Sequence, residues 1–425
     1  MIRFLFKGLL RDRQRSLLPA SVVAAGVMLT VFLVCYLTGV LSDFADFSAK
    51  FSSGHVKIMT RGYAEDMNQR PIDLALVNVD TILGEVEKDF PEMDWALRTQ
   101  FGGLLDVPDV NGETRAQGPV MGIAIDMLTP GSKEPDRLTL NDILVKGRLP
   151  DSSDEILISD ELAGKLNVVP GDEVTLMGST MYGSMSFYNF RIAGTIRFGV
   201  SVMDKGAIIV DIRDAQSALD MQDASGEILG FLPSGHYNGE EADEVCSDFN
   251  KHYSDTTDEF SPVMMKLTDQ DTFMGGYLEM IDSMGFIVVF IFVLAMSIVL
   301  WNTGLIGGLR RYGEVGVRLA IGEGKGHIYR SMIFESLLIG IAGSALGTVI
   351  GLLFAYWMQE KGIDIGSMMK GATMMMPGRF RARIVVQAYY IGFIPGLFSS
   401  TLGTMLSGVG IYRRKTAQLF KELET

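Results

Sequence analysis

Residues 310–330 read RRYGEVGVRLAIGEGKGHIYR and stand between two long stretches that carry no charged side chain. The segment holds six basic side chains when His327 is counted, two acidic ones and five glycines. Basic residues in short loops stay on the cytoplasmic side of a membrane. The segment therefore predicts a cytoplasmic loop between two membrane-spanning helices.

Four runs without a charged side chain occur in the 425 residues. About 20 apolar residues cross a bilayer, and a charge at its centre costs roughly 2.5–3.5 kcal/mol. The 48% hydrophobic content and mean hydropathy of +0.24 are high for a soluble acidic protein. We expect transmembrane helices at 17–41, 283–309, 336–359 and 384–412. Buried helices of a soluble core seldom run so far without a charge, which disfavours that alternative.

The charge is divided between the two sides of the membrane. Residues 42–282 hold 43 acidic against 18 basic side chains, while basic residues dominate segments 1–16, 310–335 and 413–425. Both termini and the 310–335 loop are then cytoplasmic, and 42–282 and 360–383 are extracytoplasmic. The 360–383 loop also contains basic residues, but the parity of four spans outweighs them.

The first run is read as an uncleaved anchor, because no small-x-small cleavage site follows it before Asp43. Residues 1–16 form either a basic amphipathic helix on the inner lipid surface or a plain basic flank.

Region 42–282 has the pattern of a mixed α+β domain. Alternating apolar and polar residues predict strands at 56–59, 97–107, 120–127, 155–159, 173–177, 187–198 and 207–210. Helices are expected at 160–166 and 211–221, each with an aspartate N-cap, and at 240–253. Residues 130–150 are expected to be mostly loop, and Asp269–Asp271 a solvated helix start.

No motif for catalysis, metal binding or nucleotide binding is recognised in the chain. The segment GEGKGH at 322–327 fails as a phosphate loop, because Gly326 takes the place of the Ser or Thr that follows the lysine. The four histidines lack metal-ligand spacing, and Cys35 and Cys246 are not expected to form a disulfide. The chain is expected to be no enzyme, to bind no cofactor, metal or nucleic acid, and to present its carboxylates as a solvated acidic surface.

Glycines recur through the third expected span, at Gly340, Gly343, Gly347 and Gly351. Small residues at this spacing let two helix backbones approach closely in lipid. The stripe predicts either packing within this chain or dimerisation with a second subunit. Pro395 should kink the fourth span. No span holds an ionisable residue, which argues against transport by midplane ion binding.

The opening segment also has a family resemblance. Asn302, the run RYGEVGVRLAIG at 311–322, Ile328, Phe334 and Glu335 resemble the signature of MacB/FtsX-like ABC transporter permeases, which include the LolC/LolE lipoprotein-releasing permeases. Gly147, EILIS at 155–159, Leu162-Ala163, Leu166 and Gly171-Asp172 resemble the MacB-type periplasmic core domain. The resemblance covers nearly the whole chain, although the proline common after the family's fourth span is missing.

The resemblance implies four transmembrane helices, with the MacB-type core domain inserted between helices 1 and 2. It also implies that segment 310–335 couples to an ABC ATPase, which holds ATP and Mg. Only 16 residues precede the first span, so that ATPase is expected to be a separate polypeptide. The coupling residues are expected to be Arg310, Arg311, Glu314, Gly316, Arg318, Ala320 and Gly322, with Glu314 and Arg318 as an i, i+4 pair.

The implied function is that of a permease subunit in a mechanotransmission-type ABC transporter of the bacterial inner membrane. Two permease subunits, identical or different, would pair with two ATPases and move the extracytoplasmic domain. The cargo stays open between lipoprotein release to a chaperone and efflux through a periplasmic adaptor. An alternative is an FtsX-like regulator that activates cell-wall hydrolases and moves no cargo. The methionines of 360–383 contact either cargo or the bilayer edge.

Overall fold

The computed structural model describes residues 13–109, 111–199, 201–253, 258–270, 286–295, 297–299, 301–302, 306, 312–364 and 379–413. It has two compact units. The helical unit comprises residues 1–41, 281–363 and 380–425, and the sheet unit comprises residues 42–280 and 364–379.

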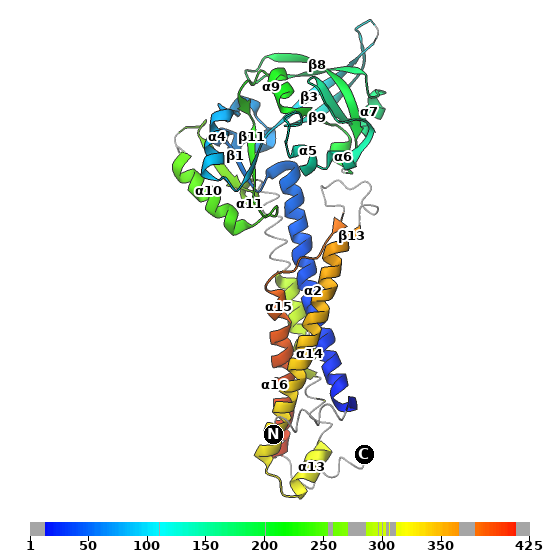
Figure 1. The fold of residues 1–425 in the computed structure, drawn as a ribbon, viewed down its shortest axis with the longest axis vertical. Helices are drawn as coiled ribbons and strands as arrows, with labels where there is room; N and C mark the ends of the chain where they lie inside the picture. The colour runs from blue at the N-terminus through cyan, green and yellow to red at the C-terminus, as the bar shows by residue number, and fades with distance from the viewer. Residues whose placement is uncertain are drawn as a thin grey trace. The chain divides into compact units, whose positions relative to one another are not determined.

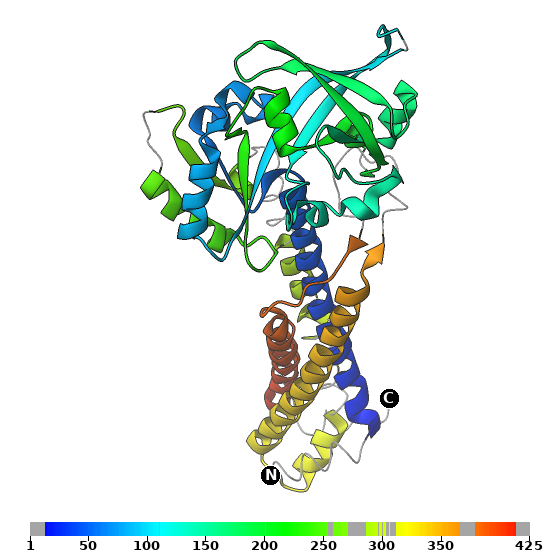
Figure 2. The ribbon, with the colours of Figure 1, turned by 45° about the horizontal axis from the view of Figure 1, so that its top comes forward.

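The helical unit is built around α2 (Arg13–Ser48), α14 (Lys325–Lys361) and α16 (Phe393–Arg413). These helices lie side by side, and the unit also contains α13 (Tyr312–Ala320), α15 (Ala388–Ile391) and helical residues within 286–299 (Figures 1 and 2). Within the described residues, two helical segments of 37 residues each, 17–53 and Lys325–Lys361, are long and apolar enough to cross a membrane. The expected span 283–309 is only partly described, and the expected span 384–412 is divided into α15 and α16 and is not among these two segments, so the count of four spans stays a prediction.

The glycine stripe of α14 lies against two helices of the same chain. A Cβ on Gly343 would lie 2.8 Å from Val23 Cβ, and one on Gly347 would lie 2.5 Å from the Ala24 carbonyl oxygen. Gly351 meets α2 in the same way, and a Cβ on Gly340 would lie 3.0 Å from Ser400 Oγ in α16. The stripe is therefore covered within the chain, and dimerisation through another surface stays a prediction.

Pro395 lies in the first turn of α16, and the helical run is interrupted at Gly392, between α15 and α16. A proline ring clashes with the carbonyl four residues earlier, here that of Ile391. The disturbance expected at Pro395 thus takes the form of a break just before it.

The sheet unit contains a ten-stranded sheet in the order β12-β1-β11-β3-β4-β9-β6-β8-β5, with β7 paired to β3 and β8. The strands are β1 (Val56–Thr60), β3 (Asp94–Pro108), β4 (Thr114–Ile125), β5 (Leu144–Gly147), β6 (Glu155–Ser159), β7 (Glu173–Ser179), β8 (Met185–Ile196), β9 (Ala207–Asp211), β11 (Glu227–Phe231) and β12 (Pro262–Lys266). Among the strand pairs of the described residues, β4–β9 and β6–β8 are parallel. Two short ladders, β2 (Leu76–Val77) with β10 (Ala224–Ser225) and β13 (Ile363–Asp364) with β14 (Arg379–Phe380), lie apart from it.

Because β7 pairs with both β3 and β8, strands β3, β4, β9, β6, β8 and β7 close into a ring, which we call the barrel lobe (Figure 1). Alternate residues of these strands form its core: Phe101, Leu105, Val120, Ala124, Ile156, Ile158, Val174, Leu176, Phe190, Ile192, Ile208 and Val210. Gly122 leaves space for the Phe101 ring, since a Cβ there would lie 2.1 Å from it. Successive side chains of each strand therefore point alternately to the inside and the outside of the ring, which is why apolar residues recur every second position in the sequence.

Strands β12, β1 and β11 form a second group with helices α4 (Val79–Asp89) and α10 (Gly239–Tyr253), which we call the flank lobe. Its core holds Val56, Ile58, Val86, Ile228, Phe249 and Met264. Strand β3 is shared by both lobes.

Short elements connect these parts. They are η1 (Ala49–Ser53), α3 (Arg61–Glu65), η2 (Met67–Gln69), η3 (Ile72–Leu74), α5 (Glu134–Arg137), α6 (Leu140–Ile143), α7 (Asp160–Leu166), α8 (Ser201–Asp204), α9 (Ile212–Ala218) and α11 (Leu267–Gln270).

Each strand expected from the sequence is present, with ends that shift by a few residues. Four local expectations are wrong or incomplete. Region 130–150 holds α5, α6 and β5 rather than mostly loop. The N-cap of α7 is Ser159, whose hydroxyl accepts from Leu162 N–H, whereas Asp211 does cap α9. Gln270 ends α11 and is buried rather than solvated. Strands β11 and β12 and helix α4 were not expected.

Replacing Gly347 by valine should push α2 away from α14, because even a Cβ would overlap Ala24. We expect a loss of about 1–3 kcal/mol in unfolding free energy, typical of overpacking. Ala345→Val, at an exposed position of α14, is the matched control and should stay within about 0.5 kcal/mol of the native chain. Thermal denaturation in detergent micelles measures both, and equal melting of the two variants would contradict this packing.

Candidate functional site

Within residues 312–332, α13, the turn that follows it and the first turns of α14 form an elbow. Val315 and Leu319 of α13 pack against Ile328 and Met332 of α14. Both pairs have the i, i+4 spacing that places side chains on one helix face. A small apolar core therefore fixes the angle between the two helices.

A glycine-dependent cap makes the turn of this elbow. Gly322 has φ +95°, Gly322 N–H donates to the Leu319 carbonyl at 3.1 Å, and Glu323 N–H donates to the Arg318 carbonyl at 3.0 Å. This is the Schellman pattern, in which a left-handed glycine lets the last carbonyls of a helix find donors. Gly322 therefore permits the turn between α13 and α14.

Arg318 also closes the turn with its side chain. Its Nε and NH2 donate to the two carboxylate oxygens of Glu323, each at 2.6 Å. This hydrogen bonding holds the pKa of Glu323 below its usual value. The imidazole of His327 lies 3.6 Å from the same carboxylate. Arg318 thus braces the elbow through Glu323.

The other expected coupling residues are spread over this elbow. Gly316 is buried in α13, and Ala320 and Gly322 are exposed. Glu314 belongs to α13 but its side chain lies outside the described residues, as do Arg310 and Arg311 entirely. The Glu314–Arg318 pair therefore stays a prediction.

A second site lies in the sheet unit, where α2 ends in the π-helix η1. The Lys50 carbonyl accepts from Arg98 NH1 at 2.8 Å, and the Ser53 carbonyl accepts from Gln270 Nε2 at 3.0 Å. Asp46 accepts from Tyr237 N–H at 2.8 Å and lies 2.5 Å from His236 Nδ1. We call these contacts the α2 anchor.

Arg98 is the most deeply buried part of the anchor, with 0% of its surface exposed. Its NH2 also donates to Glu134 Oε2 at 2.6 Å. Arg137 pairs with both Glu134 and Asp94, and its guanidinium stacks 3.8 Å from the centre of the Phe231 ring. A buried charge is tolerated only when paired in this way.

The strands on either side of the anchor are neighbours in the sheet. β1 follows α2 and η1 in the chain, and it pairs antiparallel with β12, from Val56↔Lys266 to Thr60↔Pro262. Leu267 N–H then donates to the His55 carbonyl at 3.1 Å. The segment entering the sheet unit is therefore bonded to the segment leaving it.

Residues 286–416 match the model of the family described as FtsX-like permease C-terminal. In this part of its length the chain is similar to the FtsX-like permeases.

Curated relatives of this chain include the lipoprotein-releasing system transmembrane proteins LolC of Xylella fastidiosa (strain Temecula1) and Haemophilus influenzae. The Xylella fastidiosa protein is 27% identical over 47% of this chain and 48% of its own length. The Haemophilus influenzae protein is 22% identical over 56% of this chain and 57% of its own length. The chain thus spans about half the length of the curated relatives it matches. Among solved structures, the periplasmic region of MacB from Actinobacillus actinomycetemcomitans aligns with TM-score 0.34 and 11% identity, over 52% of this chain and 91% of that one.

The sequence singles out segment 310–330, which contains the elbow, whereas the α2 anchor was not expected from it. Arg98 lies in the expected strand 97–107, and Asp46 follows the first span directly. A charge inside an apolar strand is a signal that could have marked Arg98. Its partners, 48 and 36 residues away, could not be read from it.

Replacing Arg98 by methionine should leave Glu134 Oε2 and the Lys50 carbonyl buried without the donors that Arg98 gives them, and Glu134 then keeps only Arg137 among its described ion-pair partners. We expect a loss of about 3–5 kcal/mol in unfolding free energy of the full chain, measured by chemical denaturation. Arg98→Met combined with Glu134→Gln should recover part of it, because the buried carboxylate that lost one of its two cations is then neutral. Arg191→Met, which breaks an exposed pair with Glu173, should cost at most about 1 kcal/mol. Equal losses in the single and double variants would show that the ion pair is not the cause.

His55 should make the sheet unit sensitive to acid. Burial lowers the pKa of His55 to about 4, while its Nδ1 accepts from Leu232 N–H at 2.9 Å. Between pH 6.5 and 4 the unfolded chain binds a proton that the folded chain refuses, so stability falls as pH falls, by up to about 3 kcal/mol. His55→Asn, which keeps an acceptor, should flatten this part of the pH profile, whereas His252→Asn at an exposed site should not. A profile unchanged by His55→Asn would refute the assignment.

Proposed function

We propose that this chain is the membrane subunit of a mechanotransmission-type ABC transporter in the bacterial inner membrane. A separate ATPase subunit binds ATP and Mg and hydrolyses the nucleotide, while this chain converts its motion into movement of the sheet unit outside. Two permease subunits, identical or different, form the complex with two ATPases. Both chain termini and the elbow lie in the cytoplasm.

The elbow is the observation that carries this proposal. It is basic, its turn is fixed by Gly322 and by the Arg318–Glu323 pair, and its core of Val315, Leu319, Ile328 and Met332 joins it to α14. A load applied to α13 would therefore act on α14, which continues to Lys361 without a break. A loop that only held lipid headgroups would have no need of such a core.

The α2 anchor supports the other end of the proposal. α2 is one uninterrupted helix from Arg13 to Ser48, and it belongs to the helical unit up to Leu41 and to the sheet unit from Ser42. α2 contacts the glycines of α14 along its length, and the π-helix that continues it is hydrogen-bonded to Arg98 and Gln270. One helix therefore carries both contacts. Movement of α14 would thus reach the sheet unit through a helix.

For the cargo, we propose release of a lipoprotein from the outer leaflet to a periplasmic chaperone, because the curated relatives are lipoprotein-releasing proteins. Efflux through a periplasmic adaptor is the second choice within the same class. The name of the matched family model, FtsX-like permease, supports the alternative of a regulator that activates a cell-wall hydrolase. Cross-linking of the sheet unit to a chaperone, an adaptor or a hydrolase separates the three.

Reversing the charge at Arg310 and Arg311 should release the ATPase subunit from the elbow. We expect complexes purified through this chain from native membranes to hydrolyse ATP, and the Arg310→Glu/Arg311→Glu chain to lose at least about tenfold of that activity while still inserting in the membrane. Arg318 is left unchanged, because Arg318→Glu would break the elbow itself.

The matched control is Lys205→Glu/Lys251→Glu, which reverses two charges in the sheet unit and should leave the purified activity unchanged. ATP hydrolysis that persists in the elbow variant would count against the proposed coupling.

A further inference from the structure

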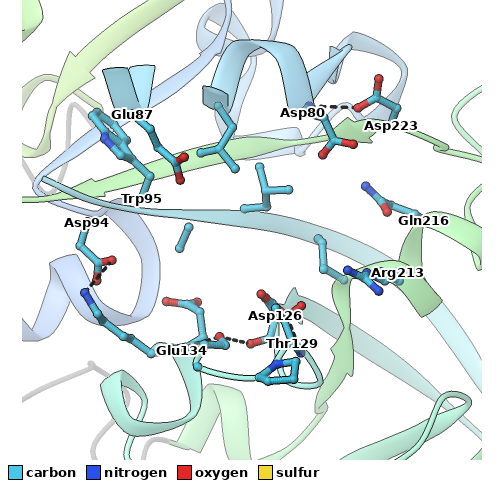
Figure 3. A pocket seen from close by; sticks show the side chains of 18 of the residues that line it. Asp80, Glu87, Asp94, Trp95, Asp126, Thr129, Glu134, Arg213, Gln216 and Asp223 are labelled. Carbon is cyan, nitrogen blue, oxygen red and sulfur yellow. Dashed lines mark hydrogen bonds and ion pairs between the residues drawn. The ribbon is translucent and has the colours of Figure 1, made fainter. Parts of the chain in front are cut away.

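An open cleft of about 750 Å³ lies in the sheet unit, between the flank lobe and the barrel lobe. One wall comes from α4 and the start of β3, and the other from residues 126–134, α5 and α9. Figure 3 shows Asp80, Glu87 and Trp95 along one wall and Asp126 and Arg213 on the other. Its volume is within the range of about 300–1,000 Å³ typical of small-molecule sites.

Some of the charges that line the cleft are already neutralised. Asp94 pairs with Lys133 at 3.1 Å and with Arg137, and Glu134 pairs with Arg98 at 2.6 Å and with Arg137. Asp94 and Glu134 are therefore neutralised by neighbouring cations, and they would attract a charged ligand only weakly.

Four other carboxylates of the lining are different. In the described part of the chain, no cationic side chain lies within 4.0 Å of Asp80, Glu87, Asp126 or Asp223. Two of them bond to backbone groups: Asp223 accepts from Asp80 N–H at 3.0 Å and Asp126 accepts from Thr129 N–H at 3.1 Å. Arg213 is a basic residue of the lining that has no ion-pair partner among the described residues. The potential of the open cleft is therefore negative, which favours cations and repels anions.

The same cleft has an apolar wall. Leu83, Trp95, Leu97 and Ile212 contribute to its surface, and Figure 3 shows Glu87 beside Trp95. An aromatic face next to a carboxylate suits a ligand that carries a cationic group on an apolar body. A purely hydrated cation would make no use of this wall.

We propose that the cleft binds a small amphipathic cation, with an ammonium group at Glu87 and an apolar body against Trp95, Leu97 and Ile212, while Asp80, two turns away on α4, adds to the negative potential. Desolvation of the ligand body supplies affinity, and the carboxylates supply the preference for positive charge. An anionic lipid headgroup or a phosphate does not fit, because it would face four carboxylates without counter-charges. This inference is independent of the ATPase and of the cargo.

The test is fluorescence titration of the full chain in zwitterionic nanodiscs with dansylcadaverine, which joins a primary ammonium to an aromatic body. Protein-free nanodiscs give the lipid background. N-acetyl-dansylcadaverine has the same body without the charge and should bind at least about tenfold more weakly, since a hydrogen bond to a charged group is worth that much.

Variants locate the site. Asp80→Asn/Glu87→Gln should weaken dansylcadaverine about tenfold, and Arg213→Gln should strengthen it about threefold, because a like charge is removed. The matched control is Glu240→Gln/Glu244→Gln, which removes two carboxylates of α10 outside the cleft and should leave binding unchanged.

Equal binding of the acetylated probe would overturn the proposal, since charge would then play no part. Equal weakening by the cleft and α10 variants would also overturn it, because it would show attraction to the acidic surface as a whole. Nucleotide hydrolysis is not measured, so failure here is separate from failure of the proposed coupling.

Discussion

The carbonyl groups at the end of α2 need hydrogen-bond donors, and the sheet unit supplies them from residues that are themselves buried. Arg98 and Gln270 donate to the carbonyls of Lys50 and Ser53 at 2.8 and 3.0 Å. A helix end buried without such partners would be costly. The position of η1 fixes Gly54, whose φ of +62° turns the chain into β1. From that point β1 enters the sheet between β12 and β11.

The helical unit depends on a steric constraint of a different kind. In lipid, helices gain little from burying apolar side chains against each other, so close backbone contact carries the packing. Gly343, Gly347 and Gly351 allow α2 to lie where a Cβ would overlap it. Ser336, Ser400 and Thr404 add hydrogen bonds between α14 and α16. The helix that carries the elbow is thus held by small residues on one side and hydroxyl groups on another.

Elements with a short repeating pattern could be predicted from the sequence, whereas contacts between residues far apart in the chain could not. Alternation located β3 and β4, because this pattern is repeated within a few residues, and the basic residues between two apolar runs marked the segment that contains the elbow. Helix α4 should have been found, since Val79, Ile82, Leu83 and Val86 have helical spacing. Strand β11 reads as a short apolar run, which a buried helix would also give. The period of β3 groups Arg98 with Ala96 and Gln100, but nothing local shows that this face is covered by η1 and α5.

The anchor and the cleft share side chains, and this has an energetic consequence. From the exposed Lys133 the contacts run through Asp94, Arg137, Glu134 and Arg98 to the carbonyl of Lys50. Each buried member is stable only while its partner is present, because an unpaired charge in a buried position costs several kcal/mol. At the exposed end of the series, Asp94 has two cationic partners and the pair with Lys133 costs little to break, because little desolvation is at stake. The buried end, at Arg98, has no water to replace a lost partner. The anchor therefore holds the end of α2 firmly, and the weak end of the same series lies at the cleft.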